Sequence, residues 1–138
     1  MRRLAPPDHR EALALARRLE HADATSCPDD RRALLLYWYG FGATRLRAEE
    51  DVMLAAWERH GGADHPFNAV VRSQHARLTA EVAAIAADPH ASAERLRRLG
   101  AALAAYLRLQ ERELCAVVER IVPPEELAAV DRALHAYR

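Results

Sequence analysis

Two stretches of this chain carry polar side chains at a spacing that suits metal ligands. Arg45 precedes Glu49 by four residues, and Tyr106 precedes Gln110 by four. Side chains four residues apart lie on the same face of a helix, one turn from each other. Helical bundles hold metals with histidine and carboxylate side chains that project inward at such spacings. The central question is therefore whether these four positions still bind a metal.

The two stretches belong to an internal repeat. Residues 45–60 and 106–121 align without gaps at a shift of 61 residues and match at six of 16 positions. A repeat of this length holds about two helices and their loops, so the sequence predicts one helix pair used twice. The matches are Leu46 with Leu107, Arg47 with Arg108, Glu50 with Glu111, Ala55 with Ala116, Glu58 with Glu119 and Arg59 with Arg120.

The elements that must position these residues are predicted to be helices. Alanine and leucine dominate an apolar content of 51%, aromatic residues make up 6%, and there are 5 glycines. This composition favours an all-α fold. Apolar periodicity and Pro/Gly signals predict helices over about 7–22, 28–60, 66–87, 92–122 and 124–137. We expect a single domain over 1–138: an antiparallel, up-down four-helix bundle with its core over 5–122 and a short final helix that covers one end of the bundle.

Charge and cysteine content limit the partners and the compartment. Basic and acidic residues number 20 each, and every one of the basic residues is arginine. This balance argues against nucleic acid or an anionic membrane as the main partner. Cys27 and Cys115 lie far apart, and no apolar run approaches 18 residues. We therefore expect a cytoplasmic protein without a membrane span.

Two predicted helices carry polar residues in the middle of an apolar face. Charges in a protein core are costly unless they are paired, so these positions require partners. We expect His9, Arg45, Glu49, His75, Tyr106 and Gln110 to meet at one level of the bundle. The two stripes are Leu34, Trp38, Phe41, Arg45, Glu49, Val52 and Ala56 in the first helix, and Leu99, Leu103, Tyr106, Gln110, Glu113 and Val117 in the second.

Four segments together resemble the hemerythrin-like (HHE cation-binding) family over about residues 5–130. Segment 8–19 is similar to the family's first-helix motif with its ligand His9, and segment 73–78 is similar to the third-helix motif with His75. Segments 47–54 and 107–115 are similar to the second and fourth helices, whose usual form is His-x-x-x-Glu. The order and spacing of these four segments agree with those of the family's four helices.

The resemblance implies a four-helix bundle with a non-haem diiron centre that binds oxygen, responds to nitric oxide or redox state, or handles iron. His9, Glu49 and His75 stand at ligand positions. Arg45 replaces the second-helix histidine, and Tyr106 and Gln110 replace the fourth-helix histidine and carboxylate. A guanidinium is always protonated and cannot donate a lone pair to iron. This ligand set is therefore too small for a standard diiron centre.

Two nearby glutamates are candidate replacements for the missing carboxylate. Glu111 lies five residues after Tyr106, a spacing that some hemerythrins use. On a regular helix it points about 140° away from Tyr106, so its use requires a π-bulge or a similar distortion. Glu113 is predicted to point inward on a regular helix and is a spare carboxylate.

The leading interpretation is a metal-free hemerythrin-like module. In this interpretation Arg45 and Glu49 form an internal ion pair, Tyr106 and Gln110 form hydrogen bonds, and the bacterial protein serves binding, regulation or a stress response. It would act without cofactor as a homodimer or with a small-molecule or protein partner. No Ser/Cys–His–Asp pattern appears at helical spacing, which favours a protein that is not an enzyme.

Two alternatives remain. In the first, His9, Glu49 and His75 hold one non-haem iron or other divalent metal, with Tyr106 and Glu113 as weaker candidate ligands. Such a centre would support redox, oxygen or nitric oxide chemistry. In the second, the aromatic stretch 37–42, which we expect to lie mostly in the core, admits haem or another flat ligand at its two glycines.

Overall fold

The chain is an all-helical protein. The computed structural model describes Leu4 and residues 9–137 of the 138-residue chain. It is 86% helical, and its described residues contain no strand. The expected all-α class is therefore confirmed. Over the same residues, no helix is long and apolar enough to cross a membrane.

The first helix, α1, runs over His9–Glu20. The sequence predicts a helix over 7–22, of which positions 7 and 8 lie outside the described residues. One side of α1 is buried, and α1 packs mainly against α6 (Ala93–Leu109). The buried side consists of Ala12, Leu15, Ala16 and Leu19.

Gly100 of α6 explains how closely α1 approaches. A Cβ atom on Gly100 would lie 2.7 Å from the carbonyl oxygen of Ala16 and 2.8 Å from the backbone nitrogen of Glu20. Neither backbone atom can move away without shifting α1. The absence of a side chain at position 100 therefore allows the two helices to pack backbone against backbone.

The predicted long helix over 28–60 is confirmed as one uninterrupted helical run over 27–59. The run alternates between α-helical turns and wider π-helical turns, in which hydrogen bonds join residues i and i+5. The π-helical segments are η1 and η2. In order, the elements are α2 (Cys27–Tyr37), η1 (Trp38–Gly42), α3 (Ala43–Ala48), η2 (Glu49–Leu54) and α4 (Ala55–Arg59).

The second half of the chain repeats this pattern. A short 3₁₀ turn, η3 (Gly62–Asp64), leads to α5 (Pro66–Ala87). A second uninterrupted run then covers 93–121 and also contains a π-helical segment, η4. Ser92 caps this run, because its side chain accepts a hydrogen bond from the backbone of Arg95 at 3.1 Å. The run consists of α6, η4 (Gln110–Leu114) and α7 (Cys115–Ile121).

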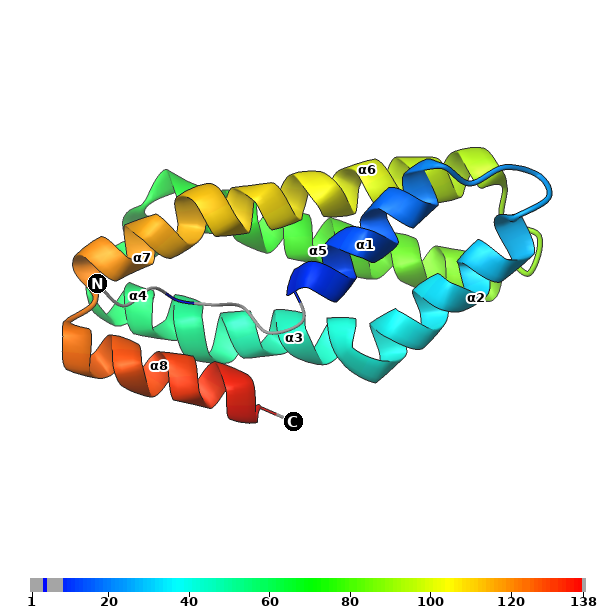
Figure 1. Cartoon of the computed structure of the whole chain (residues 1–138). Coiled ribbons are helices and arrows are strands. Elements are labelled where there is room, and N and C mark those ends of the chain that lie inside the picture. Colours follow the sequence, from blue (N-terminus) through cyan, green and yellow to red (C-terminus); the bar gives the residue numbers. More distant parts are fainter. Residues whose placement is uncertain (1–3, 5–8, 138) are drawn as a thin grey trace.

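The helices lie side by side along the long axis of the molecule (Figure 1). α6 contacts α1 and α5, and α2 contacts α1, α5 and α6. The final helix, α8 (Pro124–Ala136), was expected to cover one end of the bundle. It lies instead along the side of the run over 27–59 and contacts η2 (Figure 1). The hydroxyl of Tyr137 donates to Asp51 of η2 at 2.5 Å, which helps to hold α8 there.

Candidate functional site

Five of the polar residues predicted to face inward are buried, whereas His9 is only partly buried. His75 is 2% exposed, Gln110 1% and Arg45 7%. Glu49 and Tyr106 are buried as well. They come from α3, η2, α5, α6 and η4. The sequence therefore predicted correctly that the apolar interior contains polar residues at these positions.

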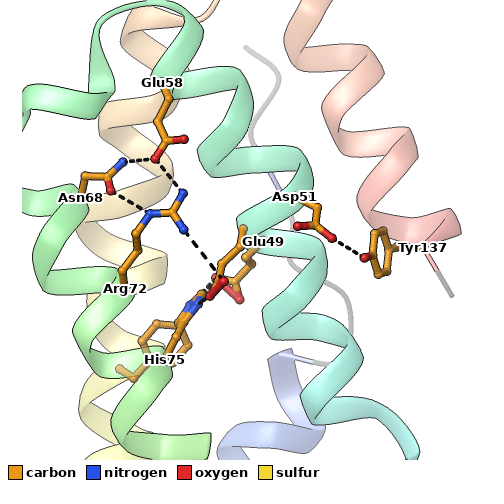
Figure 2. A network of polar contacts seen from close by, with 9 residues as sticks. Glu49, Asp51, Glu58, Asn68, Arg72, His75 and Tyr137 are labelled. Carbon is orange, nitrogen blue, oxygen red and sulfur yellow. Dashed lines mark hydrogen bonds and ion pairs between the residues drawn. The ribbon is translucent and has the colours of Figure 1, made fainter.

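A chain of hydrogen bonds joins three of the helical segments. His75 of α5 contacts Glu50 of η2 through Nδ1 at 2.9 Å and Tyr106 of α6 through Nε2 at 2.8 Å. The hydroxyl of Tyr106 donates a short hydrogen bond to Oε1 of Glu49. Nε2 of His75 also lies 3.8 Å from the same carboxylate oxygen. Figure 2 shows Glu49 of η2 and His75 of α5 close together between their two helices.

This geometry determines the charge of His75. Because the hydroxyl of Tyr106 donates to Glu49, its oxygen accepts the bond from Nε2 of His75. Nδ1 faces the Glu50 carboxylate and must donate too, so both ring nitrogens carry protons. Burial lowers the pKa of His75, but the hydrogen bonds and negative charges of Glu49 and Glu50 outweigh burial and raise it above 6.5. Below its folded pKa, His75 is therefore a buried imidazolium.

Tyr106 is a phenol rather than a phenolate. Burial raises the pKa of its hydroxyl well above 10, and the negative charge and hydrogen bond of Glu49 raise it further. The charge of Arg45 acts in the opposite direction but does not overcome these effects. Tyr106 therefore donates a proton within the hydrogen-bond chain, and a metal would have to displace that proton to use its oxygen.

The second half of the repeat contains a similar histidine–glutamate pair. Nε2 of His9, in α1, lies 3.3 Å from Oε2 of Glu111, in η4. Glu50 and Glu111 are equivalent in the repeat, since 50 + 61 = 111. Each contacts a histidine of another helix. The structure thus pairs His9 with Glu111 and His75 with Glu50.

Equivalent π-helical segments position these glutamates. η2 begins at Glu49 and η4 begins at Gln110, and 49 + 61 = 110. In a π turn each residue advances by less than the 100° of an α-helix, so later side chains point in new directions. η4 therefore supplies the π-helical distortion that a ligand role for Glu111 requires. It places the Glu111 carboxylate against His9. Segments of this kind frequently occur at functional sites.

The same distortion overturns two expectations. Glu113 was expected to point inward, but it is exposed, because η4 rotates it away from the interior. Phe41 was assigned to the buried stripe of the long helix, but it lies in η1 and is 58% exposed. Tyr39 is 61% exposed, so the stretch 37–42 is not mostly core. This removes the basis for a flat ligand there.

Arg45 does not form the expected ion pair with Glu49. None of its three side-chain nitrogens has a hydrogen-bond partner among the described residues. Oε1 of Glu49 is instead occupied by the hydroxyl of Tyr106 from α6. Gln110 also departs from expectation, because neither its amide nitrogen nor its amide oxygen is paired within that part of the chain. A buried cation and a buried amide thus lack protein partners.

Cys115 is a free cysteine in the interior. It is 4% exposed. Burial raises the pKa of its thiol to about 12, and the charges of Glu49 and Glu119 act in the same direction. A thiol in this state is a poor nucleophile and a poor metal ligand.

The side chains present do not fit a diiron centre. Both ring nitrogens of His75 donate protons, and His9 is paired with Glu111. Arg45 places a permanent positive charge in the same interior. No group of three or more histidine, cysteine, aspartate or glutamate side chains suited to a metal is present among Leu4 and residues 9–137. The structure brings Glu49 and His75 together but gives His9 a separate partner.

Sequence reasoning missed the roles of Glu50 and Arg72, and it did not identify His9 as the partner of Glu111. Glu50 continues outward to Arg72, whose Nη1 lies 3.9 Å from it, and Arg72 contacts Glu58 at 2.7 Å. Figure 2 shows Arg72 between Glu58 and His75. The signal for Glu50 and Glu111 was present in the sequence, because they are one of the six matching pairs in the repeat.

Comparison with known proteins identifies no relative. No family model matches the chain, and no curated protein or solved structure matches it either. The hemerythrin-like resemblance therefore depends on the residues quoted above.

Proposed function

We propose that this chain is a hemerythrin-like, antiparallel up-down four-helix bundle in which hydrogen-bonded side chains replace the diiron centre. We further propose that it acts as a binding or regulatory module. The observation that carries this proposal is the chain of contacts from Glu50 through His75 and Tyr106 to Glu49. Both ring nitrogens of His75 have side-chain partners, and so does one oxygen of Glu49.

The substitutions at the ligand positions support the same conclusion. Arg45, Tyr106 and Gln110 stand where the family has ligands. Iron cations would repel the guanidinium of Arg45, and Tyr106 holds its proton firmly. Arg45 therefore opposes a metal, and Tyr106 bonds a carboxylate oxygen that a metal would otherwise bind.

Metal analysis of protein produced with added iron tests the proposal. We expect no stoichiometric iron and no visible oxo-to-iron absorption band. Two irons per chain with such a band would contradict it. The complementary variant Arg45→His/Tyr106→His/Gln110→Glu restores the family's ligand types and should take up iron.

A matched control separates a restored site from adventitious binding to new histidines. Arg47→His/Arg108→His/Arg112→Glu introduces the same residue types on the same two helical runs, at exposed positions. We expect this control to remain free of iron. If both triple variants bind iron equally, or if neither binds iron, positions 45, 106 and 110 do not correspond to the family's ligand positions.

A mononuclear metal centre is the second candidate. The approach of Nε2 of His75 to Oε1 of Glu49, at 3.8 Å, favours it. His9 would complete the two-histidine, one-carboxylate set only by leaving Glu111, and Tyr106 would have to withdraw. One tightly held metal per chain that is lost in His75→Ala would support this candidate over the first.

A further inference from the structure

We propose that the groove between α5 and α6 binds an acidic amphipathic helix of a partner protein. This inference names the partner class of the proposed binding module and rests on the proposed function in that respect. None of the residues in the interior hydrogen-bond chain lines the groove. The groove is therefore present whether or not the interior holds iron.

The first argument is the shape of the groove. It has a volume of about 820 Å³ and lies where α5 and α6 pack side by side (Figure 1). Its lining extends along α6 from Ser92 to Ala105, a length of about 20 Å at 1.5 Å per residue. Helices pack with the side-chain ridges of one in the grooves of another. A partner helix of about 13 residues matches this length, whereas a small molecule would contact only part of it.

The second argument is the floor of the groove. The lining combines exposed alanines with two buried leucines, Leu78 and Leu99. Because the alanine side chain is short, another helix can approach α5 and α6 closely at these positions. The apolar face of that helix would be removed from water against the floor. The exposed alanines of the lining are Ala80, Ala101, Ala102 and Ala105.

The third argument is the charge of the lining. Three arginines and one glutamate give it a net charge of +2, although the whole chain has a formal net charge of zero. The glutamate, Glu81, lies 3.7 Å from Nε of Arg95. Arg77 of α5 and Arg98 of α6 have no ion-pair partner among the residues that the structure describes. A helix with carboxylates along the edges of its apolar face would supply partners for both.

The same charge disfavours other occupants. In a symmetric dimer formed through this groove, the two positively charged linings would face each other. The lining contains no aromatic side chain that could insert into a membrane interface or stack on nucleic acid bases. The shape, the alanine floor and the charge together favour an acidic helix.

Fluorescence anisotropy of a labelled peptide tests the groove on the full-length protein. The probe is a stapled helical peptide of about 14 residues, with leucine and alanine on one face and glutamate along both edges. We expect saturable binding to wild type, and no binding of the same peptide with lysine in place of glutamate. Arg77→Gln/Arg98→Gln should weaken binding about tenfold. Arg108→Gln/Arg112→Gln changes two exposed arginines outside the groove and should bind as wild type does.

Ala102→Gln tests the shape of the groove without changing its charge. The longer side chain occupies the floor, so we expect the acidic peptide to bind about tenfold more weakly or not at all. Ala83→Gln, at an exposed alanine of α5 outside the groove, is the matched control and should bind as wild type does. Every substituted position is exposed, so circular dichroism should show the wild-type helix content in all variants.

The assignment is overturned if wild type does not bind the acidic peptide, or if either groove variant binds it as tightly as wild type does. A wild-type dimer in sedimentation that dissociates in Ala102→Gln would assign the groove to a second copy instead. Tighter binding of phosphatidylglycerol vesicles or single-stranded DNA than of the peptide, lost in Arg77→Gln/Arg98→Gln, would assign it to a membrane or to nucleic acid.

Iron content is measured on the same sample. Two irons per chain would refute the proposed function, whereas an iron-free protein that does not bind the acidic peptide would refute the groove assignment alone.

Discussion

Nε2 of His75 and the hydroxyl oxygen of Tyr106 lie 2.8 Å apart, and their rings meet nearly edge to face with centroids 5.2 Å apart. Because the hydroxyl of Tyr106 donates its hydrogen bond to Glu49, Nε2 of His75 is the donor in this contact. One phenol thus links α5, through its histidine, to the carboxylate of η2. The relative positions of three helical segments depend on this buried polar contact as well as on apolar packing.

Removal of the Tyr106 hydroxyl should be costly. In Tyr106→Phe, Nε2 of His75 and Oε1 of Glu49 both lose a buried partner, and we expect the free energy of unfolding to fall by about 1–3 kcal/mol. Chemical denaturation measures the change. Tyr39→Phe, at a position 61% exposed, is the control and should leave stability almost unchanged. Equal effects of the two substitutions would show that the hydroxyl of Tyr106 is not in the chain described.

The raised pKa of His75 predicts how stability depends on pH. The folded protein holds this proton more tightly than the unfolded chain, whose histidine titrates near 6.5. The stabilisation is therefore fully present below pH 6.5 and is lost as the pH rises through the folded pKa. Denaturation midpoints measured across this interval should fall with pH in wild type.

The matched variant for this measurement is His75→Gln, which keeps a polar side chain but does not titrate. We expect it to lose most of the fall in stability above pH 6.5. His90→Gln, at an exposed histidine in the turn before α6, should retain the wild-type profile. A wild-type profile in His75→Gln would assign the pH dependence to another group.

Much of this arrangement could be predicted from the sequence, and the errors have a common cause. Apolar periodicity and proline or glycine at the boundaries predicted the long helices within a few residues. The inward direction of Glu49 and Tyr106 followed from a constant 100° per residue. That rule fails after a π turn, which has no marked residue preference. Phe41 and Glu113 were therefore assigned to the wrong face, while the partner of Glu111 required the structure.

The partners of the buried polar side chains could not be predicted from the sequence either. Arg45 and Glu49 lie four residues apart, which suggested an ion pair along one helix. The carboxylate instead contacts Tyr106, from a helix that begins more than 40 residues later. Local spacing indicates which side chains share a face, but only the packing of helices decides which of them meet.

Arg45→Met should stabilise the protein. In the predicted ion pair between Arg45 and Glu49, loss of Arg45 would leave Glu49 buried and unpaired, at a cost of about 3 kcal/mol. Glu49 keeps its bond from Tyr106, so that cost does not arise. Replacing an uncompensated buried cation with an apolar side chain of similar length should raise the free energy of unfolding by about 1–4 kcal/mol. A loss of stability in denaturant titrations would indicate that Arg45 has a protein partner.

Two glycine substitutions should act in opposite directions. Gly100→Ala forces a Cβ atom to within 2.7 Å of the Ala16 carbonyl oxygen, so we expect α1 to shift and the protein to lose about 1–3 kcal/mol of stability. Gly40→Ala meets no atom within 4 Å and should gain about 0.5–1 kcal/mol, because alanine favours a helix. Thermal unfolding of the pair checks the packing of α1 on α6. If Gly100→Ala leaves the stability unchanged, the close approach of α1 to α6 is contradicted.

The most direct test of the replaced metal centre is the nitrogen NMR spectrum of the His75 imidazole. It is recorded below the folded pKa of His75, on protein produced with added iron. We predict that both ring nitrogens show the chemical shifts of a protonated imidazolium, with bonds to Glu50 and Tyr106. A His75 signal broadened by paramagnetic iron, or a ring nitrogen without its proton and bound to metal, would contradict the account.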